Sequence, residues 1–237
     1  MRLESIISEK VLNIFCDAST ENTVGKVGKG SRSEVTTCGG FIAISGGKIK
    51  EEVYHHMNYG SSGVAEIDAF ESAIYYGLNN DQFFDRINIF TDYQPAVSGI
   101  RTWEAYYKYH PVDLSPTHCD INKYDRLVLD MIGNGSNNIS IYHQKSHVKY
   151  WLDGHLRAAA HVFAASNGIR NNIDLSLIKY ISRWNTYIDN ATRGLLGFVN
   201  ESPLMWNDTL EFKLTRRDEI YAWMYPLIDQ FHKNMYL

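Results

Sequence analysis

Cysteine, proline and long apolar runs are all scarce in this chain of 237 residues. Its three cysteines, Cys16, Cys38 and Cys119, form no CxxC pair, so we expect reduced thiols. No segment approaches the ~18 apolar residues that a membrane span needs, and the N-terminus lacks the continuous apolar core of a signal peptide. These absences predict a cytoplasmic protein that is neither exported nor partnered with a membrane.

An excess of positive charge is also missing, since the formal net charge is -4. Nucleic-acid binding through overall charge is therefore excluded, and any such binding requires a local patch. What the chain does have is 44% hydrophobic residues, enough for one sizeable core. This composition fits one enlarged domain or a domain with appendages.

Short β-rich runs come first, and helical patterns follow. The hydrophobic period predicts, in order, strands at 11–16, 38–45 and 48–57, a helix at 62–78, a strand at 87–92, a helix at 120–132 and a strand at 138–143. The Gly46-Gly47 pair predicts a tight turn, which makes the first three strands an antiparallel meander. The helical crossover before 87–92 implies parallel pairing with an earlier strand, so we expect an α/β fold with a five-stranded mixed sheet.

Asp17 and Asp92 each follow an apolar β-rich run, in FCD and FTD. Alone, either aspartate most often only ends its strand and turns the chain. If the two strands are parallel neighbours, however, the carboxylates converge and repel unless a cation neutralises them. Hard oxygen ligands favour Mg²⁺ or Mn²⁺ over zinc, so the pair predicts a metal site.

The segment TDYQPAVSGIRTW closely resembles the fourth strand and following helix of the type 1 ribonuclease H family. The matching positions are Thr91, Asp92, Gln94, Gly99, Ile100 and Trp103. FCDAS resembles the first strand of that family with its aspartate, Asp17. SSGVAEIDAFESAIYYGL resembles its first helix, with Glu66 at the catalytic glutamate.

RWNTYIDNATRGL is similar to the closing helix of the family, in which an asparagine precedes the last metal-binding aspartate by one turn. Asn185 and Asp189 occupy these positions. For Glu66, helical spacing offers separate support, because Phe70 and Ala73 share its face and turn it toward the sheet. The alternative is a solvated helix residue, which is how we interpret the nearby Asp68 and Glu71.

The family also has a histidine in the loop after its last strand, and His143 and His147 compete for this position. Strand alternation puts His143 with Ile139 and Ile141, where a packed histidine is usual. His147 follows in a polar loop, and we expect it to transfer a proton or help product release without ligating metal.

The resemblance implies a catalytic domain at 1–197. Residues 148–183, where the family has only a short stretch, are expected to form a helical insert, and 198–237 a C-terminal helical extension that covers the domain or offers a surface for a protein partner. The insert carries five basic and two acidic residues, which favours contact with substrate, and a purely structural addition is the alternative. Many relatives carry a basic helical protrusion where this chain has YYKYHPVDLSPTHC, with one lysine.

The implied activity is hydrolysis of the RNA strand of RNA/DNA hybrids, leaving 5′-phosphate and 3′-hydroxyl ends. Two Mg²⁺ ions about 4 Å apart, replaceable by Mn²⁺, would be held by the four carboxylates. The residues expected to contact substrate are Ala18, Ser19, Ser62, Gln94 and Asn185. Two alternatives stay open: another nuclease or strand-transfer enzyme on the same fold, and a non-catalytic nucleic-acid-binding module.

Overall fold

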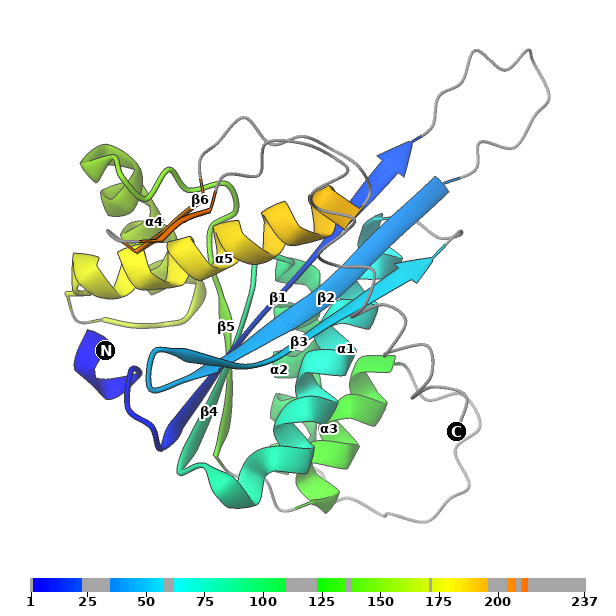
Figure 1. Cartoon of the computed structure of the whole chain (residues 1–237). Helices are drawn as coiled ribbons and strands as arrows, with labels where there is room; N and C mark the ends of the chain where they lie inside the picture. The colour runs from blue at the N-terminus through cyan, green and yellow to red at the C-terminus, as the bar shows by residue number, and fades with distance from the viewer. Residues whose placement is uncertain are drawn as a thin grey trace.

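A five-stranded mixed sheet lies between two layers of helices in the computed structural model of the chain (Figure 1). The structure describes residues 2–22, 35–57, 62–109, 123–134, 138–170, 172–195, 204–207 and 210–212. None of the helices in these ranges is long and apolar enough to cross a membrane.

Three long strands open the sheet and two shorter ones complete it. The first three, β1 (Val11–Asn22), β2 (Val35–Ser45) and β3 (Lys48–Met57), form the predicted antiparallel meander. Gly46 and Gly47 make the β2–β3 turn with φ of +59° and +72°, a conformation that favours glycine. Strands β4 (Arg86–Thr91) and β5 (Ile139–His143) run parallel to β1, giving the order β3-β2-β1-β4-β5.

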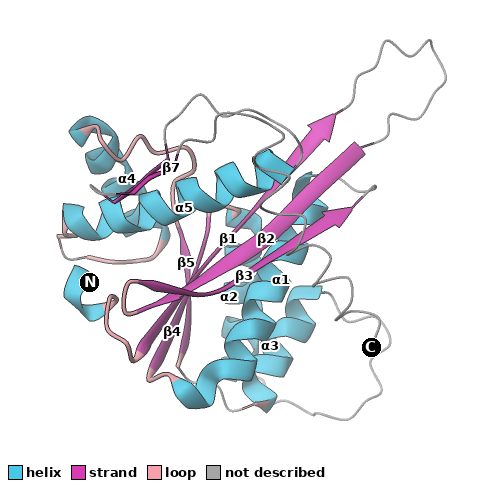
Figure 2. Cartoon of the chain, in the orientation of Figure 1, coloured by secondary structure: helices cyan, strands magenta, loops and turns pink. Residues whose placement is uncertain are grey.

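The helices divide between the two faces of the sheet (Figure 2). One face carries α1 (Ser62–Asn80), α2 (Gln94–Tyr109) and α3 (Lys123–Gly133), and the other carries α4 (Asp153–Ser166) and α5 (Leu175–Leu195). Short 3-10 helices precede β1 (Leu3–Ser5) and β4 (Asp81–Phe83). The sheet order, strand directions and layers confirm the predicted ribonuclease H-like fold.

Each face of the sheet has its own buried core. On β1, Leu12, Ile14 and Cys16 pack toward α1, whereas Phe15 packs toward α5 and stacks on Phe90 with ring centroids 4.8 Å apart. This alternation follows from the two-residue period of a strand. Because Asp17 lies two residues after Phe15 on the same strand, its side chain lies on the same face of the sheet, which α5 covers.

Two boundaries and one type of element differ from the sequence-based expectations. The first strand does not stop before Asp17 but continues to Asn22, because β2 pairs with it along this whole length. The closing helix, expected after residue 183, begins at Leu175, so the expected insert at 148–183 comprises α4 and the first part of α5.

The last difference falls in the C-terminal extension, where a helical structure was expected. There, β6 (Leu204–Asn207) and β7 (Leu210–Phe212) pair as an antiparallel hairpin. The rest of the predicted helical extension lies outside the described residues.

Candidate active site

Asp17 and Asp92 meet where β4 ends and β1 continues. The last pair between these strands is Phe15 with Phe90, so Asp17 lies two residues beyond it on β1. Asp92 directly follows Thr91, the last residue of β4. The predicted convergence of the two carboxylates is therefore present, although Asp17 lies within a strand.

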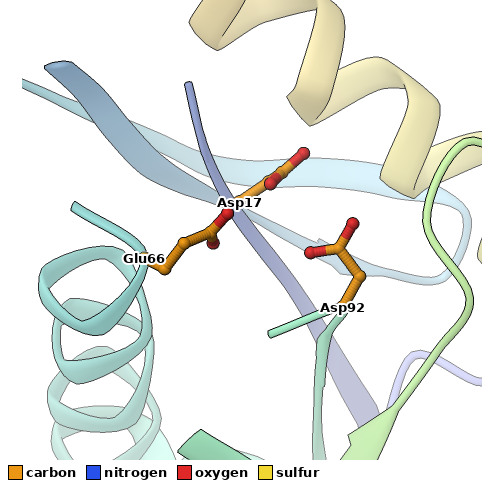
Figure 3. Close-up of side chains that lie close together, drawn as sticks. All are labelled: Asp17, Glu66 and Asp92. Atoms are coloured by element: carbon orange, nitrogen blue, oxygen red, sulfur yellow. The ribbon is translucent and has the colours of Figure 1, made fainter. Parts of the chain in front are cut away.

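Glu66 reaches the same point from the first turns of α1 (Figure 3). The helix can approach because Gly39 of β2, paired with Ala18, has no side chain. A Cβ at Gly39 would lie 2.8 Å from the carbonyl oxygen of Ala65. One carboxylate oxygen each from Asp17, Glu66 and Asp92 lies within 4.8 Å of the others, the only such group of potential metal ligands among the described residues.

Burial and mutual repulsion favour the protonated form of these carboxyl groups when no cation is bound. Burial, followed by the charges of Asp92 and Glu66, raises the pKa of Asp17 well above its usual value. Burial and the charge of Asp92 raise the pKa of Glu66 to about 9. Burial and the charge of Asp189 raise that of Asp92 to about 6.

Two hydrogen bonds partly offset this repulsion. The backbone N–H of Ala18 donates to Oδ1 of Asp17 at 2.8 Å, and a hydrogen bond links the carboxyl groups of Glu66 and Asp17. Oε2 of Glu66, however, is buried with no hydrogen-bond partner. Buried, unsatisfied carboxylate oxygen of this kind fits a hard divalent cation.

Asp189, the fourth predicted ligand, lies next to this group but is already paired. Nε of Arg193, one turn further along α5, is 2.7 Å from its Oδ1, and Nδ1 of His147 is 3.7 Å from its Oδ2. Burial raises the pKa of Asp189, whereas Arg193 and His147 lower it. Sequence reasoning missed Arg193, although its i, i+4 spacing from Asp189 is the signal of such an ion pair.

Asn185 supports Asp92 more directly than it supports Asp189. Its amide makes a hydrogen bond to the Asp92 carboxylate, which lowers the pKa of that group. Nε2 of Gln144 donates to the Oδ1 of Asn185, and both residues are buried. Asn185, predicted to bind substrate, is buried, and these bonds make it a support for the Asp92 carboxylate. Gln144 carried no motif in the sequence and was missed.

The two competing histidines occupy different environments. His147 lies in the loop after β5, with φ of +51° and a side chain that is 64% exposed. His143 is buried at the end of β5, and this burial lowers its pKa, while a hydrogen bond to the backbone of Asp92 partly raises it. Of the two histidines, His147 is therefore the one whose side chain reaches solvent.

The predicted substrate contacts are only partly accessible. Ser62 and Gln94 are exposed at the starts of α1 and α2. Ser19 is buried, and its hydroxyl shares a hydrogen bond of 2.9 Å with Thr192 of α5, so its side chain is not free for substrate. The N–H of Ala18 is likewise taken by Asp17.

No other acidic or histidine side chain of the described ranges joins this group. Asp68 and Glu71, expected in solvent, are half-buried, and the charge of Asp68 acts on His55, which hydrogen-bonds Ser72. Cys16 and Cys38 are buried free thiols, as predicted, and Cys119 lies outside the described residues.

No protein-family model matches this chain, and no curated protein sequence does. Among solved structures, it is similar to a foamy viral protease-reverse transcriptase in complex with dsDNA, at 15% identity over 68% of this chain and 96% of that one, with a TM-score of 0.44. The same viral protein with an RNA/DNA hybrid matches at 13% identity over 67% of this chain but only 20% of that one, with a TM-score of 0.44.

A cellular enzyme is also similar. RNase H1 from the halophilic archaeon Halobacterium salinarum is 19% identical over 57% of this chain and 86% of that one, with a TM-score of 0.34. At these identities the likeness concerns the fold alone, and function has to be inferred from the side chains of the site.

Proposed function

We propose that this chain is a metal-dependent nuclease that cuts the RNA strand of RNA/DNA hybrids. The observation that supports it most is the group formed by Asp17, Glu66 and Asp92, whose raised pKa values and unpartnered Glu66 oxygen call for a cation. Clusters of carboxylates that hold divalent ions are a standard means of phosphodiester hydrolysis.

The donor set determines which ions fit. Asp17, Glu66 and Asp92 offer only carboxylate oxygens, which suit Mg²⁺, with Mn²⁺ as a substitute. We infer that Asp189 contributes to a second ion on the α5 side. When bound, the ions supply an activated water for attack on the phosphate and stabilise the leaving 3′ oxygen.

Three further residues around this centre orient a carboxylate, balance its charge or transfer a proton. Asn185 orients the Asp92 carboxylate through its hydrogen bond, and Arg193 limits the negative charge at Asp189. His147, exposed in its loop, can protonate the leaving oxygen or release the product, because an imidazole ring can both donate and accept a proton.

Preference for RNA requires groups that sense the 2′-hydroxyl in the shallow minor groove of the hybrid. Ser62 and Gln94 are exposed at the two helix starts that border the carboxylates, so we infer that they contact the cut strand. The hydroxyl of Ser19 hydrogen-bonds Thr192, so we infer that Ser19 contacts the cut strand through its backbone.

The test is to incubate the protein with labelled RNA/DNA hybrid, duplex RNA and duplex DNA, each with and without Mg²⁺. We expect cleavage of the hybrid alone, in the RNA strand, with 5′-phosphate products and only when the metal is present. Equal cleavage of all three duplexes would contradict the hybrid preference. No cleavage of any of them, by protein that binds Mn²⁺, would contradict the nuclease itself.

A further inference from the structure

The end of β5 lies directly beside Asp92. His143 is the last residue of β5 to pair with β4, opposite Thr91, and the N–H of Gln144 donates to the carbonyl of Thr91 at 2.9 Å. Since β5 is the edge strand of the sheet, its outer backbone groups meet no further strand of the described residues. Another part of the molecule must therefore satisfy the outer N–H and C=O of His143.

The side chain of Asn167 takes the place of that missing strand. Its Oδ1 accepts the N–H of His143 at 2.9 Å, and its Nδ2 donates to the carbonyl of the same residue at 2.7 Å. Asn167 follows the last turn of α4, and its Nδ2 also donates to the carbonyl of Phe163 at 2.8 Å. One amide thus ties the end of β5 to α4.

Arg101 fixes this amide from the opposite layer. Its Nη2 donates to Oδ1 of Asn167 at 2.8 Å, and its Nη1 donates to the carbonyl of Ser166. Arg101 belongs to α2, which covers the other face of the sheet. The orientation of Asn167 is therefore set by elements from both helical layers, which is more than capping α4 requires.

The two residues at the end of β5, His143 and Gln144, connect Asn167 to Asp92. The side chain of His143 makes a hydrogen bond to the backbone of Asp92. That of Gln144 donates to Asn185, which in turn bonds the Asp92 carboxylate. Any movement of the β5 end would therefore reach Asp92 by two routes.

We propose that Asn167 is a positioning residue that, through His143 and Gln144, holds Asp92 in the orientation that metal binding needs. The proposal rests on the metal site of the proposed function. It also gives the segment 148–183 a role in assembling the active site, instead of the substrate contact that its positive charge favoured.

The chain contains a matched control for this proposal. Asn138, at the opposite end of β5, donates its Nδ2 to the carbonyls of Phe84 at 2.9 Å and Asp81 at 3.1 Å. It anchors the same strand with similar bonds, but at the end remote from the carboxylates. Replacing it should lower stability without altering the metal site.

The experiment measures Mn²⁺ affinity by calorimetry, below the melting temperature of every protein, for wild type, Asn167→Ala, Asn167→Asp and Asn138→Ala. We expect Asn167→Ala to weaken Mn²⁺ binding by about 10- to 100-fold, as loss of a supporting bond around a metal site typically does. Asn138→Ala should bind Mn²⁺ as wild type does. Asn167→Asp keeps the acceptor for His143 and Arg101 but loses both bonds that Nδ2 donates, so it should also weaken Mn²⁺ binding, and it serves as the test if the alanine variant does not fold.

Equal Mn²⁺ affinity in wild type and Asn167→Ala, or an equal loss in Asn138→Ala, would overturn the proposal. Hybrid cleavage is assayed separately, so that the two conclusions can fail independently. A wild type that binds Mn²⁺ without cutting hybrid contradicts the nuclease while leaving Asn167 testable. Hybrid cleavage by Asn167→Ala at unchanged Mn²⁺ affinity contradicts only the role of Asn167.

Discussion

Individual side chains in this site differ chiefly in how their charge is balanced. Asp189 has the guanidinium of Arg193 at 2.7 Å. Asp92 relies on the amide of Asn185, and its pKa is still raised to about 6. Negative charge is therefore balanced least at the group formed by Asp17, Glu66 and Asp92, and this difference determines what each substitution should do.

Asp92→Asn should abolish cleavage in Mg²⁺, because it removes a negative ligand from the metal site. Without metal, the melting temperature should hold or rise, since one of several mutually repelling carboxylates is gone. Single-turnover cleavage of labelled hybrid and thermal melting in chelator measure the two effects. Turnover near that of the wild type would show that Asp92 is not a ligand.

His147→Ala should slow single-turnover cleavage by about 10² to 10⁴, the usual contribution of a positioned acid or base. Mn²⁺ affinity should be nearly unchanged, because His147 is not part of the three-carboxylate group. His155→Ala, which removes an exposed histidine on α4, is the control and should cleave as wild type does. A large loss of Mn²⁺ affinity in His147→Ala would instead make His147 a ligand.

Hydrophobic periodicity predicted the helices and strands in which buried residues recur at regular spacing. It missed features that depend on tertiary contacts. The meander, α1 and the parallel strands followed from apolar spacing and the Gly46-Gly47 turn. The extent of β1 did not, because residues after Asp17 remain in the strand only through pairing with β2. Asp17 and Asp92 were expected from the two strand ends, and Glu66 from the family resemblance. Arg193 was missed although its i, i+4 spacing from Asp189 is a local signal, whereas Asn167 acts through contacts that no local pattern reveals.

Gly39→Ala tests whether the close approach of α1 to the sheet places Glu66. The added Cβ would lie 2.8 Å from the backbone oxygen of Ala65, so α1 must shift, at a cost of about 1–3 kcal/mol in unfolding free energy. Because Glu66 follows Ala65 directly, cleavage and Mn²⁺ affinity should fall even where the protein is fully folded. Denaturant unfolding and calorimetry measure these effects.

Gly154→Ala is the matched control, since a Cβ there meets nothing within 4 Å and the residue lies in helix α4. It should leave cleavage unchanged and stabilise the protein by up to about 1 kcal/mol, given the better helix propensity of alanine. If the Gly39 and Gly154 variants behaved alike, the close approach at Gly39 would have no role in placing Glu66.

Across the whole molecule, the candidate site joins the two helical layers. Glu66 comes from α1 on one face of the sheet, and Asp189 comes from α5 on the other, with the end of β4 between them. Folding therefore forces acidic groups from both layers together, at a cost in stability that grows as they ionise. This cost makes the stability of the metal-free protein depend on pH.

The metal-free protein should lose stability as pH rises from about 4 to about 9. Folding raises the pKa of Asp92 from 3.8 to about 6 and that of Glu66 from 4.5 to about 9. The folded state therefore binds more protons than the unfolded state within this window, so each unit of pH favours unfolding. Melting temperatures in chelator should fall across the window, and Mg²⁺ or Mn²⁺ should restore more stability near its upper end.

Glu66→Gln, which carries no charge at position 66 at any pH, should show a flatter dependence of melting temperature on pH than the wild type. Parallel melting curves for the two proteins would mean that Glu66 is not forced into an anionic cluster, and the main support for the metal site would be lost.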